Sequence, residues 1–330
     1  MFPQLSLTLA TAGLLLACGQ ETSANYLGNV ITPEFITTSS ARAADDNEPS
    51  EFIINSDQIN ESSGLARSNI NSQLLWTHND SGGETAVYAI TTTGSLVASV
   101  SLTGVAVANL DWEDMTSYVK DGKSYLLVGD IGDNFAFRPT LTFYIIEEPV
   151  VDATAPGPQR LVAPVIASFQ VRLPVTPRDI ESIAVDPTEN AAYMISKRDA
   201  QPSLYRASLN RTLPLPQGLP TPVVAEDLGF IKIPRAPEGV ANPELFNWVT
   251  TMDFSASTLS AYVGTLTNGY VYHREVGESW NTAFQKAPIT FPLPMYSQIE
   301  AGCFANNSDT TIFISSENLP GRLAKMSLTP

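Results

Sequence analysis

The sequence predicts an all-β chain folded as a β-propeller, with five blades as the main expectation. From residue 51 onward, short runs of β-branched and aromatic residues alternate with Gly, Pro, Asn and Asp, and no long run has the period of a helix. These runs recur in groups of four at regular spacing. A surplus run at 51–55 precedes the first group, whereas the last group lacks its fourth run. A propeller whose N-terminal strand completes the last blade leaves no open sheet edge.

Five similar segments mark the first strand of each repeat. They are 63–66, 113–116, 181–184, 250–253 and 300–303. A second run follows 9 to 12 residues after the start of each segment, beginning at Leu74, Tyr125, Ala192, Leu259 and Thr311. Offsets this regular predict hairpins of one kind, which a β-sandwich does not explain.

Third and fourth runs complete the predicted blades. The third runs are 86–90, 141–146, 203–208, 269–274 and 322–328. The fourth runs are 96–102, 161–173, 222–233 and 288–293. The repeats that begin at 113 and 181 are longer than the others, so six blades remain an alternative to five.

The N-terminal region predicts export. Residues 5–17 form an apolar run that is too short to span a bilayer but suits the core of a signal peptide, assigned to 1–17. The run ends in Leu15-Leu16-Ala17-Cys18-Gly19, which resembles the lipobox of bacterial lipoproteins and implies lipidation of Cys18. Because Met1 to Gln4 contain no Lys or Arg, an ordinary secretory peptide cleaved near Ala17 is the alternative.

Three segments follow from this interpretation. Residues 18–50, rich in Ser, Thr, Asn and Ala, form a flexible tether, and 51–330 form the propeller domain. The expected location is extracytoplasmic, anchored to a bacterial membrane by the lipid on Cys18. Gly19 rather than Asp after the cysteine favours the outer membrane if the cell is Gram-negative.

The composition excludes several classes of protein. The chain has 330 residues with 34 acidic against 18 basic side chains, a net charge of −16. This balance disfavours nucleic acid as a partner, since binding a phosphate backbone needs clustered cations. Two cysteines and two histidines disfavour a disulfide framework and a zinc site.

Polar side chains cluster where the first strand of each predicted blade begins and the second ends. Both places lie at the same end of the propeller channel, here called the mouth. First strands supply Glu61, Asp111, Glu113, Asp114, Arg178, Asp179, Glu181, Gln298 and Glu300. Second strands supply His78, Asn79, Asp80, Asp130, Asp133, Asn134, Lys197, Arg198, Thr265, Thr267, Glu317 and Asn318.

So many like charges at a narrow mouth need compensation by a metal ion, by basic side chains or by protons. Oxygen ligands select Ca²⁺ or Mg²⁺ rather than zinc. The candidate metal ligands are Asp111, Glu113, Asp114, Asp130, Asp133, Asn134, Asp179 and Glu181. The candidate ligand-binding residues are His78, Asp80, Arg138, Arg178, Lys197 and Arg198. The structural alternative is that Asp and Asn at strand ends fix turns and join blades.

Two motifs resemble a known family. Asp111-Trp112-Glu113-Asp114-Met115 and Asp179-Ile180-Glu181-Ser182-Ile183-Ala184 resemble a signature of the SdiA-regulated and esterase-like phytase group of bacterial propellers. Ser62-Ser63-Gly64-Leu65-Ala66, followed by Leu75-Trp76-Thr77-His78-Asn79-Asp80, is similar to the opening of these proteins. The resemblance implies secretion, a propeller and calcium at acidic residues of the mouth. Few basic residues lie at the mouth, which disfavours a phosphorylated substrate.

Two functions follow as expectations. The first is a membrane-anchored module that binds a divalent cation, Ca²⁺ being the candidate cofactor, together with a polar ligand or protein partner at the mouth. The second is a glycoside or phosphoester hydrolase that uses carboxylates from different blades, as some five-bladed glycosidases do. Its candidate catalytic residues are Glu113, Glu181 and Glu300.

Overall fold

The computed structural model describes residues 49–104, 108–210 and 221–328. The predicted signal peptide at 1–17, Cys18 and nearly all of the predicted tether at 18–50 lie outside the described residues. No helix among those described is long and apolar enough to span a membrane.

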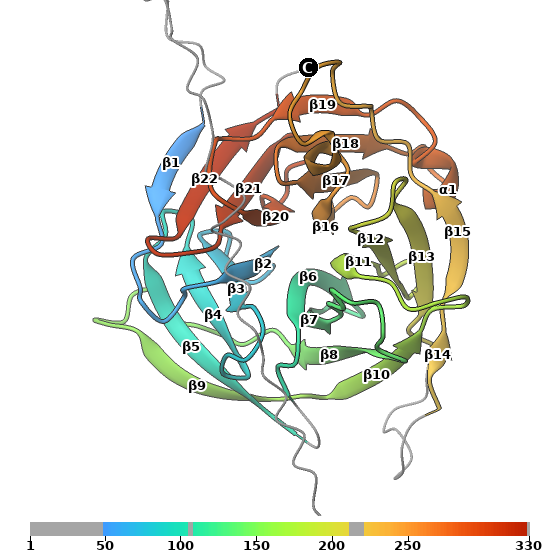
Figure 1. Cartoon of the computed structure of the whole chain (residues 1–330). Coiled ribbons are helices and arrows are strands. Elements are labelled where there is room, and N and C mark those ends of the chain that lie inside the picture. The colour runs from blue at the N-terminus through green and yellow to red at the C-terminus, as the bar shows by residue number, and fades with distance from the viewer. Residues whose placement is uncertain (1–48, 105–107, 211–220, 329–330) are drawn as a thin grey trace, which may run out of the picture. The chain divides into compact units, whose positions relative to one another are not determined.

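Five sheets surround a central axis and form the blades of a propeller (Figure 1). Blade 1 contains β2 (Ser62–Arg67), β3 (Leu74–Asn79), β4 (Ala86–Thr91), β5 (Leu96–Thr103) and β9 (Gln159–Pro164). Blade 2 contains β6 (Trp112–Lys120), β7 (Lys123–Asp130), β8 (Leu141–Glu147), β10 (Ala167–Arg172) and β14 (Val223–Val224). Blade 3 contains β11 (Ile180–Asp186), β12 (Ala191–Ser196), β13 (Ser203–Ser208) and β15 (Glu226–Phe230).

The last two blades have four strands each. Blade 4 contains β16 (Val249–Phe254), β17 (Ser260–Thr265), β18 (Asn268–His273) and β19 (Ile289–Pro292). Blade 5 contains β20 (Ile299–Phe304), β21 (Thr311–Ser316), β22 (Arg322–Ser327) and β1 (Ser50–Ile53). A short helix, α1 (Trp280–Ala283), lies between β18 and β19, and a 3₁₀ turn at Pro243–Phe246 precedes β16.

The N-terminal strand closes the propeller as the sequence predicted. β1 pairs with β22 in antiparallel register, with Phe52 opposite Leu323. The two strands lie side by side in Figure 1, blue against red. Strands from both ends of the propeller domain therefore share blade 5. The backbone N–H and C=O groups at the outer edge of β22 pair with those of β1.

The two long apolar runs at 161–173 and 222–233 are not single strands, which corrects the sequence interpretation. The first divides into β9, which adds to β5 of blade 1 in parallel, and β10, the fourth strand of blade 2. The second divides into β14, which adds to β10 in parallel, and β15 of blade 3. The additional residues of the longer repeats thus form fifth strands on existing blades, and the blade count is five.

The crossing from blade 1 to blade 2 takes place over two adjacent residues. The Val165 N–H donates to Thr103 O at 2.7 Å, whereas the Ile166 N–H donates to Ile145 O at 2.9 Å. β9 ends at Pro164, which has no backbone N–H to continue the ladder.

The core consists of apolar layers between adjacent blades. Between blades 3 and 4, the rings of Phe254 and Trp280 are stacked with centroids 4.1 Å apart, and Tyr193 meets Phe254 edge to face. The inner strands β2, β6, β11 and β16 are buried along their whole length, apart from the outer end of β6. Cys303 of β20 is a free thiol and is fully buried.

Candidate functional site

Each of the five inner strands carries a β-bulge at its mouth end. The register between the first and second strand of every blade shifts across one residue. The residues that the shift leaves unpaired are Ser63, Glu113, Glu181, Thr250 and Glu300. A bulge bends the strand and redirects the side chain of the additional residue. One residue from each blade, including the three candidate catalytic glutamates, is thus placed at the mouth.

Lys197 joins two of these glutamates. It follows β12, and its Nζ lies 2.5 Å from Glu181 Oε2 and 3.5 Å from Glu300 Oε2. Burial lowers the pKa of Lys197, but the surrounding carboxylates Glu181, Glu300 and Glu113 outweigh it and raise the pKa above its usual value. Lys197 therefore stays charged and holds two of the three candidate catalytic carboxylates in ion pairs.

Glu113 belongs to a different cluster, with Asp80 and Asp111. Each of the three offers a carboxylate oxygen, and these oxygens lie within 4.8 Å of one another. Among the described residues, no Lys, Arg or His forms an ion pair with any of the three. The acid cluster, defined as these three residues, therefore has unbalanced negative charge.

Local backbone structure positions the acid cluster. Asp80 follows β3 and its N–H donates to Glu61 O at 3.0 Å, whereas Asp111 precedes β6 and its carbonyl accepts from Ile131 and Gly132. A Cβ at position 132 would overlap Glu113 Oε1 and Asp111 Oδ2. Glycine at 132 therefore allows the loop after β7 to pass directly over the two carboxylates.

The acid cluster holds protons more tightly than free acids do. Burial, with repulsion from neighbouring acids, raises the pKa of Asp80 to about 6 and that of Asp111 to about 6, although Arg138 opposes the shift of Asp111. Burial and then repulsion from Glu181 raise the pKa of Glu113 well above its usual value. Two acids that titrate near neutral pH, beside a third that holds its proton, form a site that would gain from a bound cation.

The remaining acids of blade 2 fix the loop after β7. Arg138 Nη2 lies 2.7 Å from Asp130 Oδ1, and Arg138 Nη1 donates to Gly132 O at 2.6 Å. Asp133 Oδ2 accepts the Arg138 backbone N–H at 2.7 Å, while its buried Oδ1 has no hydrogen-bond partner among the described residues. Asp130 and Asp133, predicted as metal ligands, therefore anchor this loop.

The same loop carries two exposed aromatic side chains. Phe135 and Phe137 are 83% and 70% exposed, and Ala136 between them has φ of 52°. Its N–H donates to Asp133 O at 2.7 Å, so the loop base is fixed while the two rings project into solvent. Neither phenylalanine belongs to the site predicted from the sequence, because that site was assembled from polar residues alone.

Blade 3 adds a paired set of charges beside this loop. Arg198 Nε lies 2.9 Å from Asp179 Oδ2, and its Nη2 donates to Asn134 Oδ1 across the blade boundary. Burial, with repulsion from Glu181, raises the pKa of Asp179 to about 7 even though Arg198 opposes it. Arg178 turns away from these acids and pairs with Asp199 at 2.9 Å. A cavity of about 100 Å³ lies here, lined by Asn134, Ala136, Arg178, Asp179, Ser196, Arg198 and Asp199.

Two predicted site residues lie in the channel wall. Asp114 Oδ2 accepts the backbone N–H groups of Ile183 at 2.9 Å and Met252 at 3.1 Å, and so joins blades 2, 3 and 4. His78 is fully buried with its ring edge on Trp112, at 5.6 Å between centroids. Burial lowers the pKa of His78 to about 4, so it is neutral. Both positions fit the structural alternative that the sequence left open.

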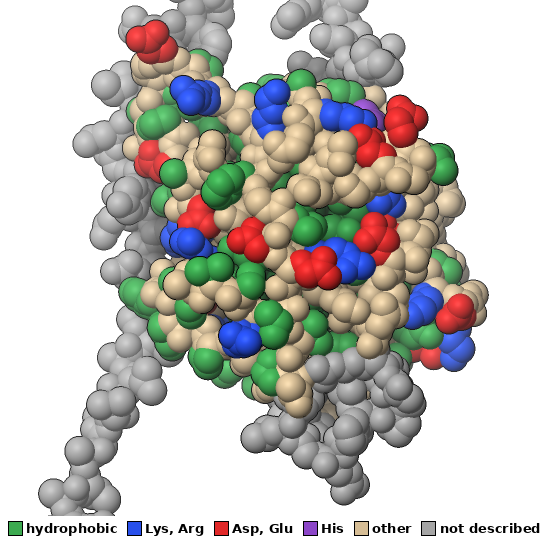
Figure 2. Space-filling view, turned by 90° about the vertical axis from the view of Figure 1, so that its right-hand side faces the viewer, with side chains coloured by type: hydrophobic (Ala, Val, Ile, Leu, Met, Phe, Trp, Pro, Cys, Tyr) green, Lys and Arg blue, Asp and Glu red, His purple; other side chains and the backbone are tan. Residues whose placement is uncertain are grey.

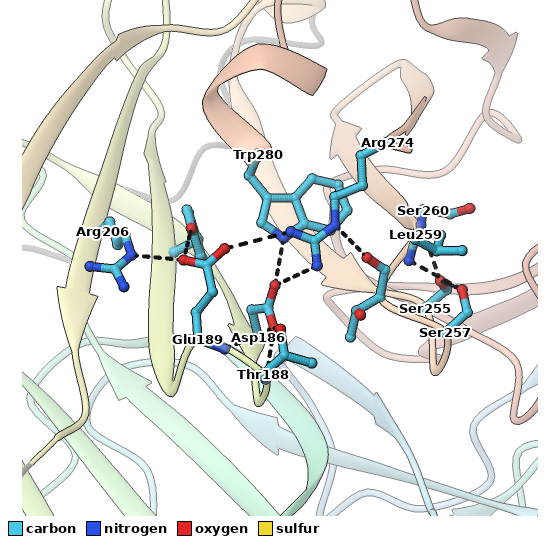
Figure 3. Close-up of polar contacts among 12 residues, drawn as sticks. Asp186, Thr188, Glu189, Arg206, Ser255, Ser257, Leu259, Ser260, Arg274 and Trp280 are labelled. Carbon is cyan, nitrogen blue, oxygen red and sulfur yellow. Dashed lines mark hydrogen bonds and ion pairs between the residues drawn. The ribbon is translucent and has the colours of Figure 1, made fainter. Parts of the chain in front are cut away.

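A second polar cluster lies at the opposite end of β11, and in it each acidic side chain forms an ion pair with an arginine (Figure 3). Arg274 Nη2 lies 2.6 Å from Asp186 Oδ2, its Nη1 lies 3.6 Å from Glu189, and its guanidinium covers the ring of Trp280 at 4.1 Å. Arg206 adds a further pair with Glu189 at 3.0 Å. This cluster ties blade 3 to blade 4, and every acid in it has a basic partner, unlike the acid cluster at the mouth.

The outer surface near α1 and β15 also mixes the two signs of charge, with blue and red side chains interspersed in Figure 2. The acid cluster, in which none of the three acids has an ion-pair partner among the described residues, differs from both of these regions. The structure brings together Asp111 and Glu113 from the predicted metal ligands, and adds Asp80, which the sequence suggested as a ligand-binding residue. Asp130, Asp179 and Glu181 are instead engaged by Arg138, Arg198 and Lys197.

Comparison with known proteins supports the fold. No protein-family model and no curated protein sequence matches the chain. The crystal structure of the major Malassezia sympodialis allergen Mala s 1 superposes with a TM-score of 0.51 at 9% identity, over 85% of this chain and 96% of that one.

Two further structures resemble this chain more distantly. Kuenenia stuttgartiensis hydrazine synthase has a TM-score of 0.41 at 10% identity, over 81% of this chain and 71% of that one. An auxiliary nutrient binding protein from Bacteroides thetaiotaomicron has a TM-score of 0.40 at 10% identity, over 81% and 57%.

Proposed function

We propose that this propeller is a binding module that holds a divalent cation, Ca²⁺, in the acid cluster. The observation that carries the proposal is the approach of carboxylate oxygens of Asp80, Asp111 and Glu113 to within 4.8 Å without a basic partner among the residues described. Ca²⁺ takes oxygen ligands, mostly carboxylates and carbonyls, in flexible geometry. A bound ion would remove both the repulsion and the burial penalty of these acids.

A protein partner at the mouth is the second part of the proposal. The exposed rings of Phe135 and Phe137 stand on a loop whose base includes Gly132, next to the acid cluster. Aromatic side chains are enriched in protein interfaces and carry much of their binding energy. A cation in the acid cluster would hold Gly132 and its loop in place and so present these rings.

Export and anchoring form the third part. The apolar run at 5–17 and the lipobox-like Cys18 support a lipoprotein outside the cytoplasm, and the motifs around Glu113 and Glu181 support membership of the SdiA-regulated and esterase-like phytase group. Substitution of Cys18 by Ser should release the protein from the membrane fraction. A C18S protein that stays with membranes would refute the lipid anchor.

Thermal unfolding with and without Ca²⁺ tests the cation site. At a Ca²⁺ concentration 100 times the dissociation constant, binding adds about 2.7 kcal/mol of stability. We expect this gain in the full chain, and its loss in Glu113→Gln. Glu147→Gln, which removes an exposed acid that pairs only with Lys123, is the matched control. Equal melting temperatures of the unmodified chain in Ca²⁺ and in chelator would refute the site.

A hydrolase at the mouth is the alternative function. The pKa of Glu113 is raised well above its usual value, and a protonated carboxyl is what a general acid needs. The other two candidates, Glu181 and Glu300, are both bound to Lys197, which favours the binding module. Assays of the unmodified chain on nitrophenyl glycosides and phosphates test the alternative, with Glu113→Gln as the inactive variant.

A further inference from the structure

A second and larger cavity lies in blade 5, outside the acid cluster. It has a volume of about 480 Å³, which is in the range of small-molecule sites. The connections before β20 and after β21, together with β1, surround it. Its lining residues are Glu51, Met295, Tyr296, Ser297, Ser316, Glu317, Asn318, Leu319, Pro320 and Arg322. None of Asp80, Asp111 and Glu113 is among them, so the residues that line this blade 5 pocket differ from those of the proposed cation site.

Glu317 gives the pocket an acidic group that has no ion-pair partner among the described residues. Its Oε2 accepts a hydrogen bond from Gln298 Nε2 at 2.6 Å. Burial raises the pKa of Glu317 well above its usual value, with repulsion from Glu300 and Asp80 adding to it. No ion pair reaches Glu317 from any Lys or Arg in the described ranges. An ammonium group entering the pocket would favour the ionised form of Glu317, which would release its proton to solvent and pair with the ammonium group.

Arg322 gives the same pocket a positive group without an acidic partner. Its guanidinium lies 5.9 Å from the ring centroid of Tyr296, in cation–π contact. Among the residues that the structure describes, no carboxylate oxygen lies within 4.0 Å of the guanidinium nitrogens of Arg322. A guanidinium binds a carboxylate through two parallel hydrogen bonds. Arg322 thus shares this cavity with two acids, Glu317 and Glu51, and among the described residues it forms an ion pair with neither.

Apolar side chains form the remaining part of the lining. Met295 is 96% exposed and Leu319 is 51% exposed, although both are large and hydrophobic. Pro320 and the ring of Tyr296 extend this apolar surface. Exposed hydrophobic side chains grouped beside charged ones are typical of a binding surface.

We propose that the blade 5 pocket binds a zwitterionic α-amino acid with an apolar side chain. Glu317 receives the ammonium group, Arg322 receives the carboxylate, and Met295 and Leu319 contact the side chain. Each charged group of such a ligand meets a protein charge that otherwise has no ionic partner. A simple amine would leave Arg322 unpaired, and a simple carboxylate would leave Glu317 unpaired.

Isothermal titration of the full chain with three related probes tests this proposal. The probes are L-leucine, L-leucine amide, which lacks the carboxylate, and N-acetyl-L-leucine, which lacks the ammonium group. We expect measurable binding of L-leucine and at least tenfold weaker binding of the other two. The titrations are run in chelator, so that the result does not depend on the proposed cation site.

Two variants assign the charges. Arg322→Met and Glu317→Gln should each weaken L-leucine binding at least tenfold, and Arg322→Met alone should abolish the preference for L-leucine over its amide. Arg178→Met is the matched control, because Arg178 lies in the other cavity and pairs with Asp199. No heat of binding with L-leucine, equal binding of L-leucine and its amide, or equal weakening by Arg178→Met would each overturn the proposal.

Discussion

Replacement of Asp111 by Asn is the most direct probe of the acid cluster. The side chain keeps its size and loses only its charge, and among the described residues no hydrogen bond to the Asp111 carboxylate would be removed by the change. Most surface acids leave stability unchanged or lower it when neutralised. For Asp111 we expect the opposite result, a more stable protein in the absence of Ca²⁺.

The size of the effect follows from the pKa of the carboxyl. Asp111 titrates at about 6 in the folded chain instead of the usual 3.8. Each pKa unit corresponds to about 1.4 kcal/mol, so the ionised group destabilises the fold by at most about 3 kcal/mol. Since the change also removes the attraction between Arg138 and the ionised carboxylate, we expect a gain of roughly 1 to 3 kcal/mol, or roughly 2 to 5 °C in melting temperature for a chain of this size.

Thermal melts at pH 7.5 in chelator measure this gain, and a second series with Ca²⁺ completes the experiment. In Ca²⁺ the order should reverse, because the unmodified chain gains the binding energy and D111N loses a ligand. Glu147→Gln serves again as the control. A melting temperature of D111N several degrees below that of the unmodified chain in chelator would refute the reasoning, since it would mean that partners stabilise the ionised form of Asp111.

Three further results are expected. First, stability in chelator should rise as pH falls from 8 to 5. Folding raises the pKa of three carboxyls, those of Asp80, Asp111 and Asp179, to about 6, about 6 and about 7. A carboxyl with a raised folded pKa contributes stability that is fully present below its unfolded pKa and is lost as pH rises through its folded pKa. A melting temperature that falls over this range would contradict it. Second, Gly132→Ala should abolish stabilisation by Ca²⁺, since its Cβ would overlap two carboxylates, whereas Gly157→Ala, with nothing within 4 Å, should keep it. Third, Arg274→Met should lower the free energy of unfolding by about 3 to 5 kcal/mol, because it leaves the fully buried Asp186 without its ionic partner. A decrease below about 1 kcal/mol in urea unfolding would show that the pair does not hold blades 3 and 4 together.

The repeat pattern predicted most of the fold because a propeller blade is defined by local sequence. The first runs at 113–116 and 181–184 lie inside β6 and β11, and the runs beginning at Leu74 and Thr311 coincide with the starts of β3 and β21. Each such hairpin joins residues close in the chain, so turn residues and apolar alternation are enough to indicate it.

The division of the long runs was not predictable from the same pattern. β9 pairs with β5, and the residues opposite each other, Ala98 and Gln159, are far apart in the chain. Apolar residues at every second position indicate a strand but not the strand with which it pairs. A strand that pairs in parallel with the previous blade, as β9 does, has no tight turn next to it that the sequence could reveal. The longer repeats therefore looked as if they could contain a sixth blade.

The site divides in the same way. The sequence indicated which residue types gather at the mouth, because blade geometry places strand starts and ends there. It did not indicate that Asp130 forms an ion pair with Arg138 and Glu181 with Lys197, while Asp111 forms an ion pair with neither. Those assignments depend on where the residues after the second strands, such as Arg138 and Lys197, place their side chains.

The sequence by itself determined that this chain is a propeller closed by its first strand, with a surplus of acid at one end of the channel. The tertiary structure decided which acids form ion pairs and which, like Asp80, Asp111 and Glu113, form none among the described residues. The physical reason is that hydrophobic period and turn chemistry are local properties, whereas the electrostatic energy of a carboxylate depends on burial and on charges brought near it by other blades.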